Sequence, residues 1–241
     1  MRSDRIAIDV PASPTAILRV MLVVSLAICA VSAITQVAEN LGWDYPSRHA
    51  QRVLDVDEEQ AIGAWWGSAL LFLGAVLATS AAAASPSRTL RRGWWALSVF
   101  VLLISLDETI ALHEVVSQRL RARFDTSGVL HHAWVVPATL ILVVLAVLAV
   151  PFVRALTART RRLLLMAGGL FVGGGLGFEV VGGPFKNRYG EQGLPYMVPT
   201  HLEEMLEMAG ASVLVYALLT DRASAPPDAP GPGPGPGPSP E

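Results

Sequence analysis

The feature that most constrains this chain is a series of six apolar runs, each close to 20 residues long. A helix needs about 20 consecutive, mostly apolar residues to cross the hydrocarbon core of a bilayer. A spanning segment must also satisfy its backbone polar groups internally, so these runs predict helices rather than open strands. The expected spans are Ala16–Val37, Ala61–Ala84, Gly93–Val116, Ala133–Val153, Leu163–Gly182 and Thr200–Leu219.

The composition points to the same class of protein. Hydrophobic residues make up 52% of the 241 residues and charged residues only 16%, whereas soluble proteins carry about 25% charged residues. The net charge of −2 provides no basic field, so we expect no nucleic-acid partner. The single cysteine, Cys29, leaves no intrachain disulfide and no thiolate metal motif. We therefore expect an all-α polytopic membrane protein, a bundle of about six transmembrane helices whose partner is the lipid bilayer.

The termini and the loop charges predict how the chain is organised. Residues 1–15 are expected to form a cytoplasmic segment, residues 16–222 the transmembrane domain, and residues 223–241 a disordered tail rich in Pro and Gly. Arg residues are concentrated in the N-terminal segment and in the second and fourth loops, which predicts an inner (plasma) membrane protein with both termini cytoplasmic. The first span is expected to stay uncleaved, although Val31-Ser32-Ala33 also fits a loose signal-peptidase pattern.

Acidic residues inside the predicted spans are the strongest functional signal. A charge at the bilayer centre costs about 2.5–3.5 kcal/mol, and the three runs that hold these acids contain no Lys or Arg. Protons, a metal cation or basic residues from a loop must therefore offset them. The acids are Asp107, Glu108, Glu114, Glu179, Glu203, Glu204 and Glu207.

Depth and helical phase predict that these acids converge. A rise of about 1.5 Å per residue places all seven in the outer half of the membrane, where His131, His132 and His201 also open their spans. Asp107 and Glu114 are seven residues apart and are expected on one helix face, whereas His113 points away and is expected to be structural. The three glutamates of the sixth span share an arc of about 100°, and such close like charges require a cation or protons.

Carboxylates combined with imidazoles from several helices are the donor set of metal sites in helical bundles. An oxygen-rich set with some imidazole suits Fe, Mn or Zn. We therefore predict a divalent metal ion in an acid- and His-rich pocket, with a metal-dependent membrane enzyme as one hypothesis and Glu203 as its general base. The predicted ligands are Asp107, Glu108, Glu114, Glu179, Glu204, Glu207, His201 and His131.

Three alternatives stay open at this point. A proton- or ion-coupled transporter or channel would need a polar path through the inner half as well. A membrane scaffold or assembly factor would use the acids as a docking surface. In the third alternative the acids simply lie in water at the outer interface.

Glycines in the fifth span predict close helix approach. Gly169, Gly173 and Gly177 form a small-xxx-small stripe that predicts a homo-oligomer. Gly168, Gly175 and Gly182 form a second stripe that shares its face with Glu179, which is expected to point inward.

Three segments also carry a resemblance to a known group of proteins. They are SLDETIALHE (Ser105–Glu114), FVGGGLGFEVVGG (Phe171–Gly183) and HLEEMLEMAG (His201–Gly210). With them the chain resembles uncharacterised bacterial multipass integral membrane proteins that have LDE…HE and EExxEM segments. The resemblance covers the last five predicted helices and implies that these acids are the functional residues, but it implies no particular activity.

Overall fold

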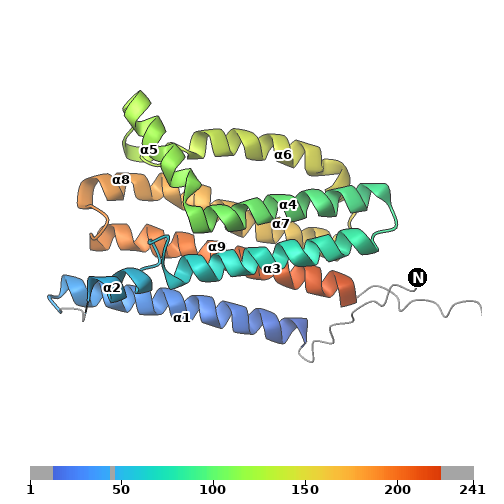
Figure 1. Cartoon of the computed structure of the whole chain (residues 1–241), viewed down its shortest axis with the longest axis horizontal. Helices are drawn as coiled ribbons and strands as arrows, with labels where there is room; N and C mark the ends of the chain where they lie inside the picture. Colours follow the sequence, from blue (N-terminus) through green and yellow to red (C-terminus); the bar gives the residue numbers. More distant parts are fainter. Residues whose placement is uncertain (1–12, 44–46, 224–241) are drawn as a thin grey trace, which may run out of the picture.

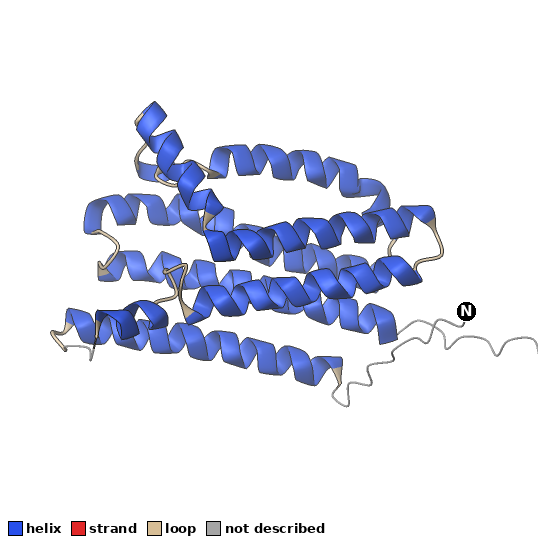
Figure 2. Ribbon diagram, in the orientation of Figure 1, coloured by secondary structure: helices blue, strands red, loops and turns tan. Residues whose placement is uncertain are grey.

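The structure, a computed structural model, describes residues 13–43 and 47–223. Within these ranges all regular structure is helical, and Figures 1 and 2 show long helices aligned along one direction. Most of the predicted N-terminal segment and nearly all of the predicted tail lie outside the described residues. The elements are α1 (Pro14–Asn40), α2 (Arg48–Leu54), α3 (Ile62–Ala84), α4 (Arg88–Ile110), α5 (Leu112–Phe124), η1 (Gly128–Leu130), α6 (Val135–Ala155), α7 (Ala158–Val172), η2 (Gly173–Phe178), α8 (Glu179–Tyr189) and α9 (Leu194–Ala223).

The helices confirm the predicted fold class, an all-α polytopic membrane protein. Five helical segments of the described chain are long and apolar enough to cross a membrane: α1, α3, α4, α6 and the continuous stretch Ala158–Tyr189. The sixth predicted span lies in α9, which is long enough at 30 residues but is not among these segments. Its first half carries three glutamates, so α9 needs other helices around it to separate these charges from lipid.

α9 is the central helix of the bundle. It packs against α1, α3, α7, η2 and α8. Met208, Val215 and Leu218 are almost fully buried on it, with at most 1% of each residue exposed. By contrast α6 is mostly exposed and apolar, for example at Leu140 and Leu148, as expected of a surface in contact with lipid.

Small polar side chains join α3 to α4 inside the apolar core. The hydroxyl of Ser98 donates to the carbonyl oxygen of Ala75 at 2.9 Å, and the hydroxyl of Ser105 donates to that of Ser68 at 2.9 Å. Interhelical hydrogen bonds of this kind contribute about 0.6 kcal/mol each in membrane bundles. They also fix the rotation of α4, whose last turn carries acidic residues of the site.

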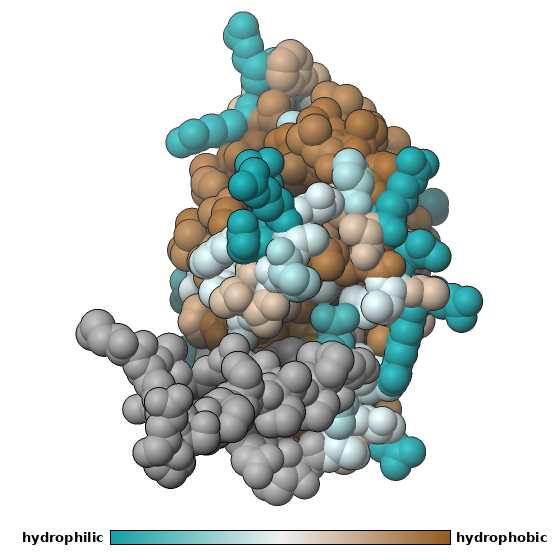
Figure 3. Space-filling model, turned by 90° about the vertical axis from the view of Figure 1, so that its right-hand side faces the viewer, coloured by the Kyte–Doolittle hydropathy of each residue, from teal (hydrophilic) through white to brown (hydrophobic). Residues whose placement is uncertain are grey.

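One end of the bundle collects the arginines of the second and fourth loops. α1 begins there, α9 ends there, and the α3–α4 and α6–α7 turns lie at the same end (Figure 1). Figure 3 looks at this end and shows hydrophilic side chains projecting around an apolar surface. The exposed residues here include Arg88, Arg91, Arg92, Arg159 and Arg162.

The third predicted span, Gly93–Val116, is not one helix, and this corrects the sequence analysis. α4 ends at Ile110, and Ala111 adopts the left-handed conformation with φ of 52° before α5 begins. The side chain of Asp107 accepts a hydrogen bond from the backbone N–H of His113 at 3.1 Å, so it caps the start of α5. The break removes the shared helix face that was predicted for Asp107 and Glu114.

The fifth predicted span contains a π-helical segment. η2 runs through Gly173–Phe178 between α7 and α8 and leaves no gap in the helix. A Cβ atom at Gly174 would come within 2.9 Å of the carbonyl oxygen of Glu203, so this glycine allows α9 to approach. Gly174 belongs to neither predicted stripe. The stripe Gly169, Gly173 and Gly177 is exposed, and added Cβ atoms there would meet nothing within 4 Å. That open face is available to a second copy, and the homo-oligomer stays a prediction.

Substituting Gly174 tests the close approach of η2 and α9. We expect Gly174→Ala to lower the free energy of unfolding by about 1–3 kcal/mol because the new methyl group overpacks the contact with Glu203. Gly173→Ala, in the same segment with open space around it, is the matched control and should leave the unfolding temperature unchanged. Thermal unfolding in detergent measures both variants, and equal effects would contradict the contact.

Candidate functional site

A cavity of about 600 Å³ lies between α4, α6, α7 and α9 and reaches the loop before α3. We call it the main cavity. We call the part nearer the arginine-rich end of the bundle the inner part and the opposite part the outer part. The inner part is lined by apolar side chains, including Leu97, Phe100, Leu164 and Leu214. The outer part is lined by ten acidic side chains: Asp57, Glu58, Glu59, Asp107, Glu108, Glu114, Glu179, Glu203, Glu204 and Glu207. The cavity is therefore amphipathic, with a long apolar section and an acidic outer section.

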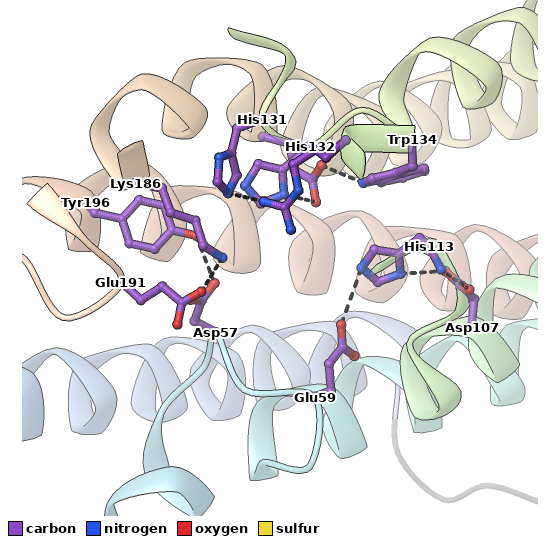
Figure 4. Close-up of polar contacts among 12 residues, drawn as sticks. Asp57, Glu59, Asp107, His113, His131, His132, Trp134, Lys186, Glu191 and Tyr196 are labelled. Carbon is purple, nitrogen blue, oxygen red and sulfur yellow. Dashed lines mark hydrogen bonds and ion pairs between the residues drawn. The ribbon is translucent and has the colours of Figure 1, made fainter. Parts of the chain in front are cut away.

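His113 joins two of these acids in a three-residue chain. Its Nδ1 lies 2.8 Å from Oδ2 of Asp107, and its Nε2 lies 3.3 Å from Oε1 of Glu59. Figure 4 shows the imidazole held between the two carboxylates. The break at Ala111 makes this possible because it turns the start of α5 back toward Asp107.

The charges around His113 control its protonation. Burial lowers the pKa of His113, but the hydrogen bond and charge of Asp107, together with Glu59, outweigh it and raise the pKa to about 9. Burial raises the pKa of Glu59 to about 7, against the opposing effect of His113. At neutral pH His113 is thus a partly buried cation beside acidic groups.

A second chain of contacts lies along the outer part of the main cavity. The indole N–H of Trp134 donates to Oε2 of Glu179 at 2.6 Å, and Nδ1 of His132 lies 3.4 Å from Oε1 of the same carboxylate. The ring of Trp134 also packs 5.1 Å from that of His113. Glu179 is only 8% exposed, so it points inward as the sequence predicted.

A third group lies where the loop before α3 meets α8 and α9. The hydroxyl of Tyr196 donates to Oδ1 of Asp57 at 3.2 Å, and Nζ of Lys186 lies 3.0 Å from Oε1 of Glu191 (Figure 4). Burial raises the pKa of Asp57 to about 6, although Lys186 opposes the shift. Lys186 is the single Lys or Arg among the residues that line the main cavity in the described chain.

The glutamates of α9 line the acidic part of the cavity together with Glu108. The carboxyl groups of Glu108 and Glu207 lie within hydrogen-bonding reach of each other, and a hydrogen bond between them would require a proton on one of them. The glycines of η2 leave room for this arrangement, because a Cβ atom at Gly175 would collide with the carboxylate of Glu207. Glu203 and Glu204 complete the same wall.

Two of the histidines predicted as ligands lie away from the main cavity. His201 contacts the carbonyl oxygen of Met197 at 2.9 Å and the hydroxyl of Ser32 at 3.1 Å, so it connects α9 to α1. His131 contacts the guanidinium of Arg121 at 2.5 Å. Its neighbour His132 borders the cavity instead.

Six of the eight predicted metal ligands share one cavity without forming a preorganised metal site. Asp107, Glu108, Glu114, Glu179, Glu204 and Glu207 all line it, as does Glu203, the predicted general base. In the described part of the chain, however, no three His, Cys, Asp or Glu side chains are grouped in a way that could hold a metal ion. The metal ion stays a prediction.

Several residues of this site were not predicted from the sequence. Glu59 and Asp57 belong to a loop and therefore did not enter an argument about spans. His113 was expected to point away because one uninterrupted helix was assumed across Ala111. The run Asp55–Glu59, directly before an apolar segment, was the available signal for the two loop acids.

The fold and the cavity define an all-helical integral membrane protein with an acidic pocket. The chain belongs to a family described as a domain of unknown function, DUF8692, whose family model matches residues 17–221. No curated protein and no solved structure matches the chain.

The protonation of His113 can be measured directly. In ¹³C-histidine NMR spectra of the protein in micelles, we expect His113 to titrate near pH 9. Asp107→Asn keeps an acceptor but removes a charge, so it should lower this pKa by more than one unit. The stabilisation from this pair is full below pH 6.5, the ordinary value for histidine, and is lost as the pH rises through about 9.

The control for this titration is Asp125→Asn, which removes an exposed carboxylate at the outer end of α5. It should leave the pKa of His113 unchanged. A wild-type His113 that titrates at or below 6.5 would contradict the proposed ion pair.

Proposed function

We propose that this membrane protein binds an amphiphilic cation, a molecule with an amine or ammonium group and an apolar tail, in the main cavity. The observation that carries the proposal is the division of one cavity into an acidic outer part and an apolar inner part. Ligand pockets of comparable size are mostly apolar and orient their ligand with a few polar groups.

The electrostatics of the cavity favour a positively charged group. Ten carboxyl groups line it, against Lys186 and the imidazoles of His113 and His132. Lys186 is already paired with Glu191 and His113 with Asp107 and Glu59. A cation among the remaining acids relieves their mutual repulsion and replaces the protons that they would otherwise hold.

The apolar section fits a hydrocarbon tail. Side chains from α4, α6 and α7 line it, among them Phe100, Ile141 and Phe171. Each Å² of apolar tail surface that is removed from water contributes about 25 cal/mol of binding free energy. For a tail that comes from the bilayer, the section replaces lipid with an apolar surrounding of defined shape. The same apolar lining weighs against the ion-channel alternative, which needs a polar path through the inner half.

The residue types that line the main cavity also limit the reactions that it can support. No Ser, Thr or Cys lines the main cavity in the described chain, and the one Tyr that lines it, Tyr196, donates its hydroxyl to Asp57. A serine, threonine or cysteine nucleophile is therefore not supplied there. Carboxylates and an imidazole are present, which suits binding, proton transfer or both.

A divalent metal ion is the second candidate, and the Glu108–Glu207 pair, whose carboxyl groups lie within hydrogen-bonding reach of each other, favours it. Two carboxyl groups in such a pair become two metal ligands when a cation takes the place of a proton between them. Glu203 and Glu204 line the same wall and could complete the ligand set after small side-chain movements.

Binding of dodecyltrimethylammonium to the purified protein in maltoside detergent tests the proposal. We expect titration calorimetry to show saturable binding that dodecyl sulfate does not reproduce. Glu204→Gln should weaken it by about tenfold, because a charge-assisted contact contributes about 1.5–3 kcal/mol. Asp125→Asn is the matched control, since it removes a carboxylate outside the cavity, and should change the affinity less than twofold.

Two results would overturn the amphiphile assignment. One is equal binding of the cationic and the anionic detergent. The other is stoichiometric binding of Zn²⁺ or Mn²⁺ that depends on Glu204 and Glu207, with no binding of the alkylammonium ion; this result would assign the cavity to a metal.

We also propose that the protein lies in the inner membrane with its arginine-rich end, and hence both termini, in the cytoplasm. The positive-inside rule and the exposed arginines at that end support this orientation. In a Cys29→Ala background, an impermeant maleimide added to intact cells should label Gln192→Cys and leave Pro86→Cys unlabelled. Both positions are exposed, at opposite ends of the bundle, and the reverse labelling would contradict the orientation.

A further inference from the structure

A second, smaller cavity of about 80 Å³ adjoins the outer end of the main cavity. We call it the mouth cavity. His113, Glu114, His132, Trp134 and Lys186 line both cavities, so the two are neighbours. Only the mouth cavity is lined by Ser117, Gln118, Arg121 and Glu191. Its size suits one small charged group, such as a carboxylate, with little space beyond it.

Arg121 is a charge in this cavity that forms no ion pair with the described residues, although it acts electrostatically on Glu191, which lines the same cavity and is paired with Lys186. Its guanidinium donates to Nε2 of His131 at 2.5 Å, and no carboxylate of the described residues lies within ion-pair distance. Burial, with the charges of His132 and Arg121, lowers the pKa of His131 to about 4, so that imidazole is neutral. A guanidinium is suited to bind a carboxylate through two parallel hydrogen bonds.

Ser117 supplies an independent sign of a missing ligand. It is 5% exposed, it lines the mouth cavity, and its hydroxyl has no hydrogen-bond partner. A buried hydroxyl without a partner costs about 1–3 kcal/mol. The hydroxyl and the guanidinium of Arg121 lie four residues apart on α5, which places them on one face of that helix.

The order of charges along the two cavities is informative. From the inner end outward, a ligand meets the apolar section, then the acidic section, and then the mouth cavity with Arg121. Glu114 lines both cavities and marks the border between them.

We infer that the ligand is a zwitterion whose cationic centre is next to its apolar tail and whose carboxylate lies further out, in the mouth cavity against Arg121 and Ser117. This inference rests on the proposed function and adds the second charge and its position. It excludes the opposite order, in which an anionic phosphate lies between the tail and the ammonium group.

Three detergents with the same tail separate these orders of charge. They are dodecyltrimethylammonium, dodecyl dimethylglycine betaine, in which the carboxylate is outermost, and dodecylphosphocholine, in which the ammonium is outermost. We expect the betaine to bind the wild-type protein about tenfold more tightly than the alkylammonium ion, because it adds a charge-assisted contact with Arg121. Dodecylphosphocholine should bind more weakly than either.

Variants of α5 locate the second charge. Arg121→Gln should remove the advantage of the betaine and leave alkylammonium binding within about twofold. Arg123→Gln, an exposed arginine on the same helix that does not line the cavity, should leave the advantage intact. Ser117→Ala should reduce the advantage severalfold and raise the unfolding temperature of the ligand-free protein, because it removes an unpaired buried hydroxyl.

The outcomes distinguish the two proposals. If the alkylammonium ion binds in a Glu204-dependent manner but the betaine has no advantage, only the zwitterion is wrong. If neither detergent binds, the proposed function fails as well. If free acetate raises alkylammonium affinity as much as the attached carboxylate does, the mouth cavity takes a separate anion, and the zwitterion is overturned.

Discussion

The structure depends on one constraint: three glutamates of α9 must be kept away from lipid in the middle of an apolar bundle. A charge exposed to hydrocarbon costs several kcal/mol at the bilayer centre and less toward the interface. α9 is therefore surrounded by α1, α3, α7 and α8, and a cavity rather than hydrocarbon receives its carboxyl groups. The glycines of η2 and the break after α4 serve the same requirement, since one leaves space for Glu207 and the other brings His113 to the acids.

The acids of the site fall into two groups: those that interact with a neighbouring side chain and those that only line the cavity. Asp107 and Glu59 share an imidazolium, Glu179 accepts from an indole, and Glu108 and Glu207 lie within hydrogen-bonding reach of each other. Glu203 and Glu204 line the same wall. The acids that have partners are held in place, and the acids that have none among the described residues remain available to bind a cation.

Much of the fold could be predicted from the sequence, because apolar runs of bilayer length leave few alternatives to helices. Convergence of the acids on one cavity could also be predicted, since it follows from the depth of each residue along its helix. The helix break could not be predicted. Alanine is the strongest helix former, and nothing in the local sequence signals that Ala111 ends a helix. The contact of His113 with Asp107 and Glu59 follows from that break, so it was invisible to an argument based on a straight helix.

α6 has few contacts with the rest of the bundle and exposes an apolar face, so its position should depend on the surrounding bilayer. This helix contacts mainly α4 within the bundle, yet Pro137, Ala138, Ile141 and Leu142 form one wall of the main cavity. In a bilayer we expect lipid to contact the exposed apolar face of this wall. If the main cavity holds an apolar tail, as proposed, we expect its volume to respond to the lateral pressure and thickness of the surrounding membrane.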